Sequence, residues 1–318
     1  MKNTSAKNLA ITGVAGYIAP RHLKAIRDTG NKLIAAFDPH DSVGILDSFF
    51  PNTHFFTEFE RLERYVEKIR SEKSKDQIDY VTICSPNYLH DAHIRFALRN
   101  QADAICEKPL VINPWNIDAL QKIESSSGKK IYTILQLRVH PLLLKLKKEI
   151  ENNQQKKKVD IVLSYVTSRG PWYQISWKGN LERSGGLITN IGIHFFDLLL
   201  WLFGAVQKSE VHLNEKDKIC GFLELQNARV KWYLSIDMND LPKEVIDKNQ
   251  RTFRSLTMDG KEIEFSGGFT DLHTEVYKKT LSGEGFRLED ARPPIELVYQ
   301  IRNLKPKGKN NNAHPFVT

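Results

Sequence analysis

Two groups of residues in this 318-residue chain have types and spacings that could move protons or stabilise charge. Glu107 and Lys108 directly follow the apolar segment ADAIC, and open α/β sheets bind ligands at the carboxyl ends of their strands. On a helix, His194 would share one face with Asn190 and Asp197, which lie four residues before it and three after it. Each group has an ordinary alternative: a solvated loop start with an ion pair for the first, and a hydrogen-bonded core histidine for the second. The fold that positions these residues therefore decides between chemistry and structure.

Small residues after the first apolar segment, LAIT, indicate a dinucleotide site. The turn reads Gly13-Val14-Ala15-Gly16-Tyr17-Ile18-Ala19, and small side chains there let the backbone approach a pyrophosphate at the start of the next helix. The glycine pattern is incomplete, because Ala15 and Ile18 occupy two of its positions, and a plain tight turn is the alternative. Asp38 ends the following strand, where a carboxylate binds ribose hydroxyls and repels a 2′-phosphate. Because no arginine follows in Pro39-His40-Asp41, these residues favour NAD over NADP.

The first half of the chain alternates apolar strands with helical segments, which predicts a parallel, doubly wound sheet of the Rossmann type. Strands are expected at LAIT, KLIAAFD, IDYVTI, ADAIC and KKIYTILQLRV. Helices are expected near residues 17–29, 55–70, 90–100 and 113–128. Pro20 in the first turn and Gly30 after the last turn delimit the first of these helices.

The second half changes to consecutive strands with alternating side chains, which predicts an α+β domain with a largely antiparallel, open-faced sheet. Its strands are expected at VDIVLSYVTS, ICGFLELQ, ARVKWYLSID, TFRSLTMDG and KEIEF, and its helices near residues 190–203, 269–281 and 288–303. We therefore predict an α/β protein with two domains. Residues 1–135 would form an NAD-binding Rossmann domain, and residues 136–318 an α+β domain for substrate binding and oligomerisation.

One strand of the second domain indicates how copies of the chain assemble. In VKWYLSID, one face carries Val230, Trp232, Leu234 and Ile236, and the other carries Lys231, Tyr233, Ser235 and Asp237. One face needs covering helices, and the other is free to pair with a second copy. We predict a homo-oligomer, specifically a homotetramer.

The composition excludes several classes of protein. Hydrophobic residues make up 41% and charged residues 26% of the chain, which is typical of a folded soluble protein. We find no apolar run of about 20 residues that could cross a bilayer, and the segment MKNTSAKNLAITGVAG lacks the features of a signal peptide. Cys84, Cys106 and Cys220 are too widely spaced for a disulfide framework or a zinc site. We expect a cytoplasmic protein with no metal and no membrane insertion.

The charge balance is basic, with 46 Lys and Arg against 38 Asp and Glu, a net charge of +8. The main basic runs lie at residues 145–158 and 305–309. The first alternates with leucines and predicts an amphipathic helix, whereas the tail KPKGKNNN is expected to be flexible. Without an aromatic basic stripe or a nucleic-acid motif, no nucleic-acid partner is expected.

A Rossmann start, a strand-end Glu-Lys-Pro and a Gly-Gly-x3-[Asp/Asn]-x3-His helix together resemble the Gfo/Idh/MocA oxidoreductase family over nearly the whole chain. In that family the lysine and the histidine flank the nicotinamide and the reacting carbinol, which the resemblance transfers to Lys108 and His194. Asn190 replaces the usual aspartate and removes one potential proton acceptor. The segments GVAGYIAPRHLKAI, CSPNYLHDAHI, TSRGPWYQISWKG and GFTDLHTEVY are similar to the nucleotide-sugar branch, the UDP-N-acetylglucosaminuronate 3-dehydrogenases of the WlbA/WbpB type.

This resemblance implies an activity: NAD-dependent oxidation of the sugar C3 hydroxyl of UDP-N-acetylglucosaminuronic acid (UDP-GlcNAcA) to a 3-keto sugar, for bacterial O-antigen, with an aminotransferase acting next. We expect His194 as general base, with Asp197 orienting it, and Lys108 holding the hydroxyl and the developing oxyanion. The reverse roles remain open. So does the fate of NADH, which either leaves or is reoxidised in place by a 2-oxo acid. The alternatives are another sugar or inositol dehydrogenase of the family, or a non-catalytic NAD-binding sensor.

The resemblance also implies which residues contact the ligands. On the cofactor side, Ser85, Pro86, Asn87, His90 and Glu107 would line the nicotinamide ribose. On the substrate side, the cations Arg169 and Lys178 suit phosphate or carboxylate, and Asn190 would contact the sugar. Stacking on uracil or sugar would come from Trp172, Tyr173 or Trp177. An ordinary aromatic surface loop is the alternative for this segment, and Gln136 and Arg138 are weaker candidates.

Overall fold

Contacts divide the chain into two units in the computed structural model, which describes residues 6–152, 157–263 and 271–317. The first unit comprises residues 1–136 and 270–292, and the second comprises residues 137–269 and 293–318. The predicted boundary between residues 135 and 136 lies next to the end of the first segment. The prediction did not include the return of residues 270–292 to the first unit.

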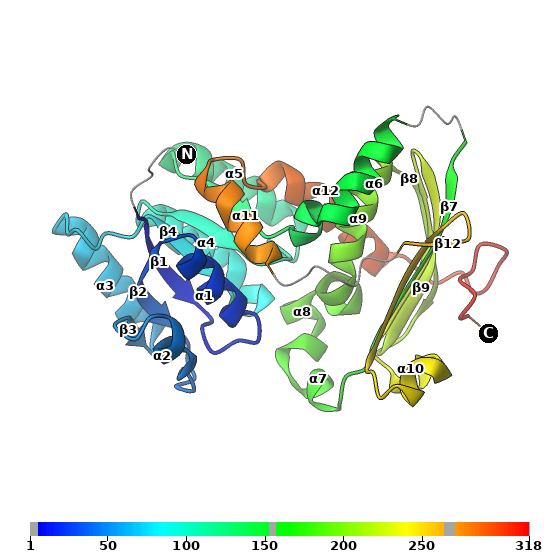
Figure 1. Cartoon of the computed structure of the whole chain (residues 1–318), viewed down its shortest axis with the longest axis horizontal. Coiled ribbons are helices and arrows are strands. Elements are labelled where there is room, and N and C mark those ends of the chain that lie inside the picture. The colour runs from blue at the N-terminus through cyan, green and yellow to red at the C-terminus, as the bar shows by residue number, and fades with distance from the viewer. Residues whose placement is uncertain (1–5, 153–156, 264–270, 318) are drawn as a thin grey trace. The chain divides into compact units, whose positions relative to one another are not determined.

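The first unit is built on a six-stranded sheet with the order β3-β2-β1-β4-β5-β6, in which all neighbours run parallel. The strands are β1 Asn8–Thr12, β2 Lys32–Phe37, β3 His54–Phe56, β4 Tyr80–Ile83, β5 Asp103–Cys106 and β6 Ile131–Thr133. The helices are α1 Ala19–Asp28, α2 Ile45–Phe49, α3 Phe59–Ser71, α4 His90–Arg99, α5 Pro114–Ser127 and α11 Leu272–Leu281. Figure 1 shows these helices around the sheet. The predicted doubly wound sheet is confirmed.

Three short elements of this unit differ from the prediction. The helix expected from residue 55 begins only at Phe59, because His54–Phe56 forms the edge strand β3. The short helix α2 was not expected at all. β6 ends at Thr133, and residues Gln136–Val139 form a 3-10 turn, so the last predicted strand was too long. Three-residue strands carry too few side chains for an alternating pattern to stand out.

The second unit is built on a mixed sheet with the order β12-β11-β7-β10-β9-β8. Its strands are β7 Val159–Thr167, β8 Val206–Asn214, β9 Lys218–Leu225, β10 Ala228–Ser235, β11 Thr252–Met258 and β12 Lys261–Glu262. β7 and β10 are parallel, and the other neighbouring pairs are antiparallel. Its helices are α6 Pro141–Asn152, α7 Trp172–Ile175, α8 Leu181–Ser184, α9 Ile193–Phe203 and α10 Lys243–Asp247, while α12 Leu288–Asn303 contributes to both units. The predicted α+β architecture is confirmed. β8 was missed, and the end of KEIEF and Phe269 lie outside the described residues.

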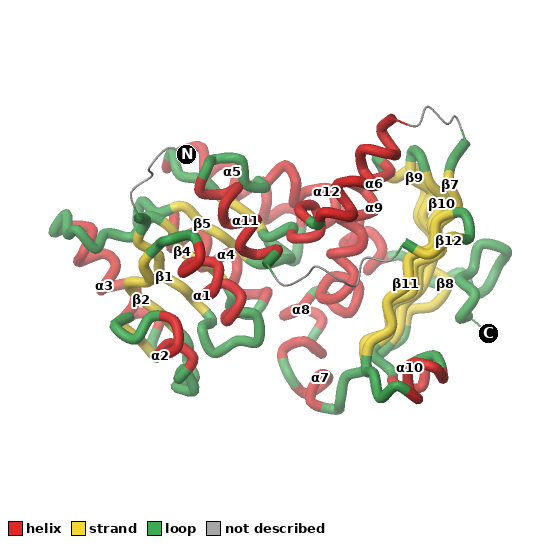
Figure 2. The backbone as a smooth tube through the Cα atoms, in the orientation of Figure 1, coloured by secondary structure: helices red, strands yellow, loops and turns green. Residues whose placement is uncertain are grey.

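One face of β10 packs against a helix as the sequence pattern predicts, and the other face is partly covered by the chain itself. Trp232 packs edge-on against Phe196 of α9, with 5.3 Å between ring centroids. On the opposite face, Tyr233 contacts His314 and Phe316 of the C-terminal segment, at 5.3 and 5.5 Å. The tail KPKGKNNN, expected to be flexible, is attached to the sheet in the structure, because the Lys307 amide donates to the Val211 carbonyl at 2.9 Å, and His314 and Phe316, which follow the tail, contact Tyr233. Figure 2 shows the C-terminal segment beside the sheet. Part of the face predicted to be open is therefore covered by the chain itself.

Residues 181–203 form a helical stretch that is long and apolar enough to cross a membrane by composition. Within its most apolar window, 67% of the residues are buried inside the structure. Phe196, Leu199 and Phe203 are among these buried side chains. The apolar character of this stretch is that of a core helix.

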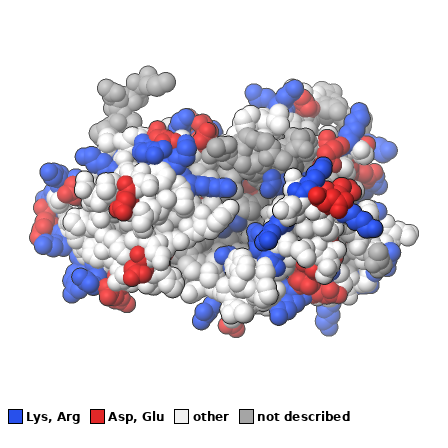
Figure 3. Space-filling view, turned by 60° about the horizontal axis from the view of Figure 1, so that its bottom comes forward, with Lys and Arg blue, Asp and Glu red and all other residues white. Residues whose placement is uncertain are grey.

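The basic run at the start of the second unit forms the predicted amphipathic helix, α6. Leu143 and Leu146 are buried, while Lys145 and Lys147 pair with Glu149 and Glu151 one turn later, at 3.8 and 3.3 Å. Figure 3 shows basic and acidic side chains interspersed on the face it displays. These lysines therefore belong to a solvated helix face with nearby acidic partners. Lys156 lies outside the described residues.

Candidate active site

The turn between β1 and α1 is tight enough to require glycine. Gly13 has a φ of +80°, and a Cβ atom there would lie 2.6 Å from the backbone of Cys84 and Ser85. The Gly16 amide donates to the Gly13 carbonyl at 3.0 Å, which closes the turn before α1 begins at Ala19. Because glycine has no Cβ atom, the backbone of this turn can approach a pyrophosphate closely. The geometry fits a dinucleotide, although the glycine pattern of the sequence is incomplete.

Asp38 lies directly after β2 and faces this turn. Its carboxylate accepts hydrogen bonds from the backbone amides of Ala15 and His40, each at 3.0 Å, and the residue is 5% exposed. The structure thus brings Asp38 together with Gly13, Ala15 and Gly16, as predicted for a ribose-binding carboxylate. Tyr17, in contrast, is 88% exposed. Ile18 is half-buried.

His93 of α4 contacts the loop that follows β4. Its Nδ1 atom lies 2.9 Å from the Ser85 hydroxyl and 3.0 Å from the Thr12 hydroxyl. Burial, with a smaller contribution from the neighbouring His90, lowers the pKa of His93 to about 3. A neutral imidazole therefore links the ends of β1 and β4, and Ser85 is buried against it.

The low pKa of His93 predicts a loss of stability in acid. The unfolded chain protonates this imidazole below about pH 6.5, whereas the folded chain does not until about pH 3. Between these two values, each unit by which the pH falls lowers the free energy of unfolding by up to about 1.4 kcal/mol through this one group. We expect the midpoint of thermal unfolding to fall from pH 7 to about pH 4 less steeply in His93→Gln, which takes up no proton. Parallel pH profiles of the two proteins would contradict this account.

His90 connects the loops that follow β4 and β5. Its Nδ1 atom lies 2.7 Å from the Pro109 carbonyl oxygen, and its Nε2 atom lies 2.8 Å from the Ser85 carbonyl oxygen. The ring is 1% exposed. In the structure His90 connects the two loops through these two contacts. The predicted contacts of His90, Pro86 and the buried Asn87 with a cofactor stay predictions.

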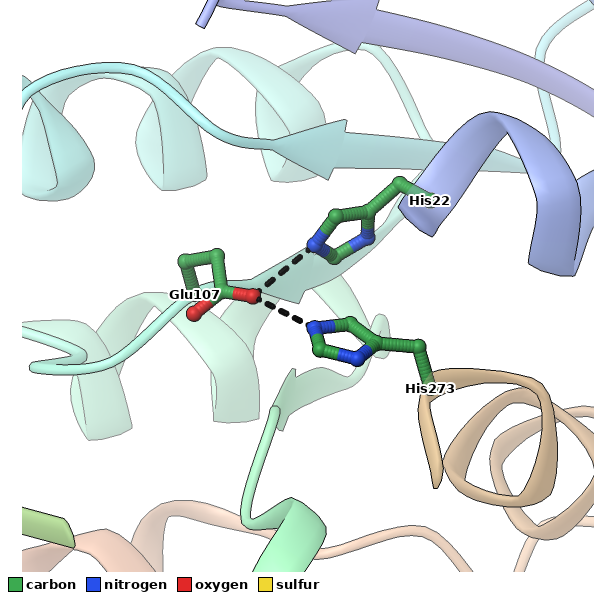
Figure 4. A group of neighbouring side chains, drawn as sticks. All are labelled: His22, Glu107 and His273. Carbon is green, nitrogen blue, oxygen red and sulfur yellow. Dashed lines mark hydrogen bonds and ion pairs between the residues drawn. The ribbon is translucent and has the colours of Figure 1, made fainter. Parts of the chain in front are cut away.

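Glu107 and Lys108 lie at the carboxyl end of β5, next to this loop pair. The Glu107 side chain is buried, and its carboxylate contacts His22 of α1 and His273 of α11, as Figure 4 shows. Sequence reasoning missed both histidines. His273 falls within the quoted segment GFTDLHTEVY, but nothing in its local sequence indicates a partner 166 residues earlier.

In the second unit, the segment after β7 gathers the predicted cations and aromatic rings. The Lys178 ammonium lies over two indole rings, 5.3 Å from the centroid of Trp172 and 4.9 Å from that of Trp177. Burial and the nearby Arg169 guanidinium lower the pKa of Lys178. Trp172 is 52% exposed and Arg169 is exposed. Two cations that destabilise each other in this way favour an anionic ligand between them.

Asn190 is tied to this segment through Tyr173. The Asn190 side-chain amide donates to the Tyr173 hydroxyl at 2.7 Å. Tyr173 is 3% exposed among apolar neighbours that include Ile191 and Ile236, and burial raises the pKa of its phenol. Trp172 therefore offers a ring face for stacking, whereas the buried Tyr173 positions Asn190.

The helix that carries Asn190 and His194 departs from the α-helical spacing assumed in the sequence. Residues Ile188–Gly192 form a π-helical turn that continues directly into α9 at Ile193, so only Ile193 separates His194 from the end of the π turn. A π turn widens the spacing between successive turns and occurs frequently at functional sites. Asp197 is 2% exposed, and both its oxygens accept hydrogen bonds from Arg138, at 2.6 and 3.2 Å. Its role in orienting His194 stays a prediction.

Comparison with known proteins agrees with this geometry. Residues 7–134 match the model of an oxidoreductase family with an NAD-binding Rossmann fold, named GFO_IDH_MocA, and residues 147–245 match its C-terminal alpha/beta domain. The chain is 51% identical to the WlbA (WbpB) dehydrogenase from Thermus thermophilus, over 98% of this chain and 99% of that one. The TM-scores are 0.93 for that protein's complex with NAD and α-ketoglutarate and 0.92 for its complex with NAD and UDP-GlcNAcA. The chain belongs to the Gfo/Idh/MocA oxidoreductase family.

Other members of the Gfo/Idh/MocA family are more distant. Inositol 2-dehydrogenase of Rhizobium meliloti (strain 1021) is 30% identical over 40% of this chain and 37% of its own length. D-Glucoside 3-dehydrogenase of Escherichia coli (strain K12) is 28% identical over 45% of this chain and 42% of its own length. The chain thus spans less than half the length of these two relatives. Membership of the family confirms the predicted oxidoreductase class and NAD as cofactor.

Asp38 should decide between NAD and NADP in this member of the Gfo/Idh/MocA family. Replacing it with serine removes a charged hydrogen-bond acceptor for the ribose hydroxyls, worth about 1.5–3 kcal/mol, and should weaken NAD binding about 10- to 100-fold. The same change removes the repulsion of a 2′-phosphate, so NADP should bind more tightly than before. Calorimetric titration of both nucleotides measures this. An unmodified protein that prefers NADP would contradict the role of Asp38.

Proposed function

We propose that this chain oxidises the C3 hydroxyl of UDP-GlcNAcA to a 3-keto sugar with NAD as hydride acceptor. The observation that carries the proposal is the 51% identity, over 98% of the chain, to a WlbA (WbpB) dehydrogenase whose structure contains NAD and UDP-GlcNAcA. Because the match covers 98% of the chain, it includes both units. The chain also has the lysine and the histidine that the reaction needs, Lys108 and His194.

The second unit supplies groups that suit a nucleotide-sugar acid. Such a substrate has a diphosphate and a carboxylate, and Arg169 and Lys178 are cations of matching charge. The exposed ring of Trp172 offers a stacking surface for uracil or sugar, and Trp177 lies beneath the same ammonium group. Asn190, held by Tyr173, would bind a sugar hydroxyl. A simple polyol such as inositol would not need this pair of cations.

The reaction assigns separate tasks to the two candidate catalytic residues. NAD, when bound, supplies the acceptor for the hydride that leaves the sugar C3. His194 takes the proton of the C3 hydroxyl as general base, which leaves the oxygen to form the ketone. The Lys108 ammonium donates a hydrogen bond to that oxygen and stabilises the negative charge that develops there.

We also propose that a 2-oxo acid takes the hydride back within the same protein. The Thermus thermophilus relative has been solved with NAD and α-ketoglutarate together. Transfer of the hydride to the keto carbon and of a proton to the keto oxygen would yield a 2-hydroxy acid and restore the oxidised cofactor. Product analysis tests this: 2-hydroxyglutarate should form in equal amount to the 3-keto sugar when 2-oxoglutarate is present.

The product places the reaction before a transamination. A 3-keto sugar is the substrate that an aminotransferase requires to install a 3-amino group, so an aminotransferase would act next. The resulting diamino sugar acid would enter bacterial surface polysaccharide such as O-antigen. Nucleotide-sugar chemistry of this kind belongs in the cytoplasm.

A direct assay tests the proposed function. UDP-GlcNAcA added to the protein with NAD should raise absorbance in the reduced-nicotinamide band, and myo-inositol should not. A response to myo-inositol alone would replace the proposal with an inositol dehydrogenase. No response to any sugar, with NAD bound, would indicate a non-catalytic sensor.

We propose a homotetramer assembled through the part of the second sheet's outer face that the C-terminal segment leaves uncovered. Tyr233 is already covered by His314 and Phe316, so the contact would lie beyond these residues. Light scattering at micromolar concentration should give the mass of four chains. A monomer mass at that concentration would contradict the proposal.

A further inference from the structure

A buried hydrogen-bonded group lies directly beneath Lys108. The Glu107 Oε1 atom is 2.9 Å from His22 Nε2 and 3.0 Å from His273 Nε2, and Oε2 accepts from the Lys108 backbone amide at 3.2 Å. All three side chains of the group are almost completely buried. As Figure 4 shows, the two rings approach the same carboxylate oxygen from two different helices. The residues come from α1, β5 and α11, far apart in the sequence.

The hydrogen atoms of this group can be placed from its chemistry. A carboxylate oxygen accepts and does not donate, so Nε2 carries a hydrogen atom on both imidazoles. His22 Nδ1 is then free to accept from the Tyr277 hydroxyl, which lies 2.9 Å away. The Tyr277 oxygen in turn accepts from the Thr82 hydroxyl, at 2.8 Å. Every donor in this series of hydrogen bonds, from Thr82 through Tyr277 and His22 to Glu107, has an acceptor when Glu107 is ionised and His22 is neutral.

The electrostatics of the group agree with this assignment. Burial raises the pKa of Glu107, but the hydrogen bonds from His22 and His273 together with their electrostatic interactions outweigh burial and hold that pKa well below its usual value. Burial lowers the pKa of His22 and raises that of Tyr277. The other titratable groups that interact with Glu107 are His90 of α4, Cys84 after β4 and Cys106 of β5. The ionised Glu107 carboxylate is therefore buried beside Lys108, with hydrogen-bond donors around it.

The same three residues could in principle bind a metal ion, since their ligand atoms all lie within 4.8 Å of one another. Zinc would need bonds of about 2.0–2.2 Å to nitrogen and oxygen. Here both nitrogens are at hydrogen-bond distance from one oxygen, and the outer nitrogen of His22 contacts Tyr277. Hydrogen bonds account for these contacts without an ion.

We propose that His22, Glu107 and His273 form a positioning unit for Lys108: the two imidazoles hold the Glu107 carboxylate ionised, and the carboxylate fixes the Lys108 backbone through its amide. This inference rests on the proposed function, in which Lys108 binds the reacting oxygen. The unit ties the end of β5 to two helices that the chain supplies from distant segments. Glu107 is thereby a positioning residue, with its side chain directed away from solvent.

The first experiment compares matched variants of His273. His273→Gln keeps an N–H donor at the end of the side chain, whereas His273→Leu removes it and leaves the carboxylate with one imidazole donor. Losing that donor raises the pKa of Glu107, so kcat of the Leu variant should fall more steeply toward acid pH than kcat of the parent. At neutral pH its kcat should fall about 10- to 100-fold, as expected for a misplaced catalytic group. The Gln variant should retain most of the parent's activity and its profile.

Glu107→Gln separates charge from packing. Its side chain has nearly the same volume but cannot titrate, so kcat should fall without the steeper loss of activity toward acid pH. Equal NAD affinities and equal thermal unfolding midpoints would show that all variants are folded. The proposal is wrong if His273→Leu and His273→Gln have the same kcat and the same pH profile.

A second measurement needs no substrate and therefore does not depend on the proposed function. Nitrogen NMR of the histidine-labelled protein should show His22 and His273 with hydrogen on Nε2 throughout about pH 5 to 8. A hydrogen atom on Nδ1 alone in either ring would overturn the positioning unit. So would stoichiometric zinc in the purified protein that disappears in His22→Gln. If the NMR result holds but no sugar is oxidised, the proposed function fails and the buried network remains.

Discussion

Replacing His194 with asparagine should lower kcat by about 10²–10⁴-fold, the usual cost of removing a general base. Asparagine is smaller than histidine but keeps hydrogen-bonding capacity, and it cannot take the hydroxyl proton. His194 lies in the first turn of α9, after the π-helical turn, and is half-buried. The affinities for NAD and UDP-GlcNAcA should therefore stay close to those of the parent.

Steady-state kinetics and calorimetric titration of the His194→Asn variant measure this separation. Ile246 of α10, which is 47% exposed, provides a control position outside the residues assigned to the site, and Ile246→Ala should leave kcat unchanged. A His194→Asn variant that keeps most of its turnover would refute the assignment of His194 as the base.

Replacing Lys108 with methionine should have the second large effect. Methionine matches the length of the lysine stem but has no charge, so the developing oxyanion loses its electrostatic partner. We expect kcat to fall by about 10²–10³-fold, as in other sites that lose one such donor. The Michaelis constant for UDP-GlcNAcA should also rise, because a positive charge beside an anionic ligand is removed.

The pH profiles of the two variants distinguish their roles. If His194 is the base, the acid limb of the kcat profile should disappear in His194→Asn and survive in Lys108→Met. The opposite pattern, an acid limb lost only in Lys108→Met, would make Lys108 the base and His194 the stabilising group.

The fold could be predicted wherever side-chain periodicity was strong. β1, β4 and β5 are short apolar runs bounded by turn residues, and their parallel order follows from the intervening helices. β8 was missed because its first half is polar and largely exposed, and its buried residues Glu210, Val211 and His212 are consecutive and include two polar side chains. The C-terminal segment was misjudged because its composition, rich in lysine and asparagine, conceals the aromatic contacts of His314 and Phe316. A local sequence pattern does not show which distant residues a segment contacts in the folded protein.

The candidate site shows the same division. Glu107, Lys108, Asp38 and the small residues around Gly13 could be found because they follow strands directly, where α/β sheets bind ligands. The partners of Glu107 could not be found from the sequence, because His273 reaches Glu107 only through the return of α11 to the first unit. The π-helical turn before His194 was equally hidden, because the sequence spacing also suits a regular α-helix.

Transfer of deuterium from the sugar tests the central claim most directly. UDP-GlcNAcA labelled with deuterium at C3 would be incubated with the protein and NAD, and the products analysed by mass spectrometry. The account predicts deuterium on the reduced nicotinamide, and on C2 of 2-hydroxyglutarate when 2-oxoglutarate is present. Unlabelled reduced nicotinamide, with deuterium retained on the sugar, would show that the hydride does not come from C3 and would contradict the account.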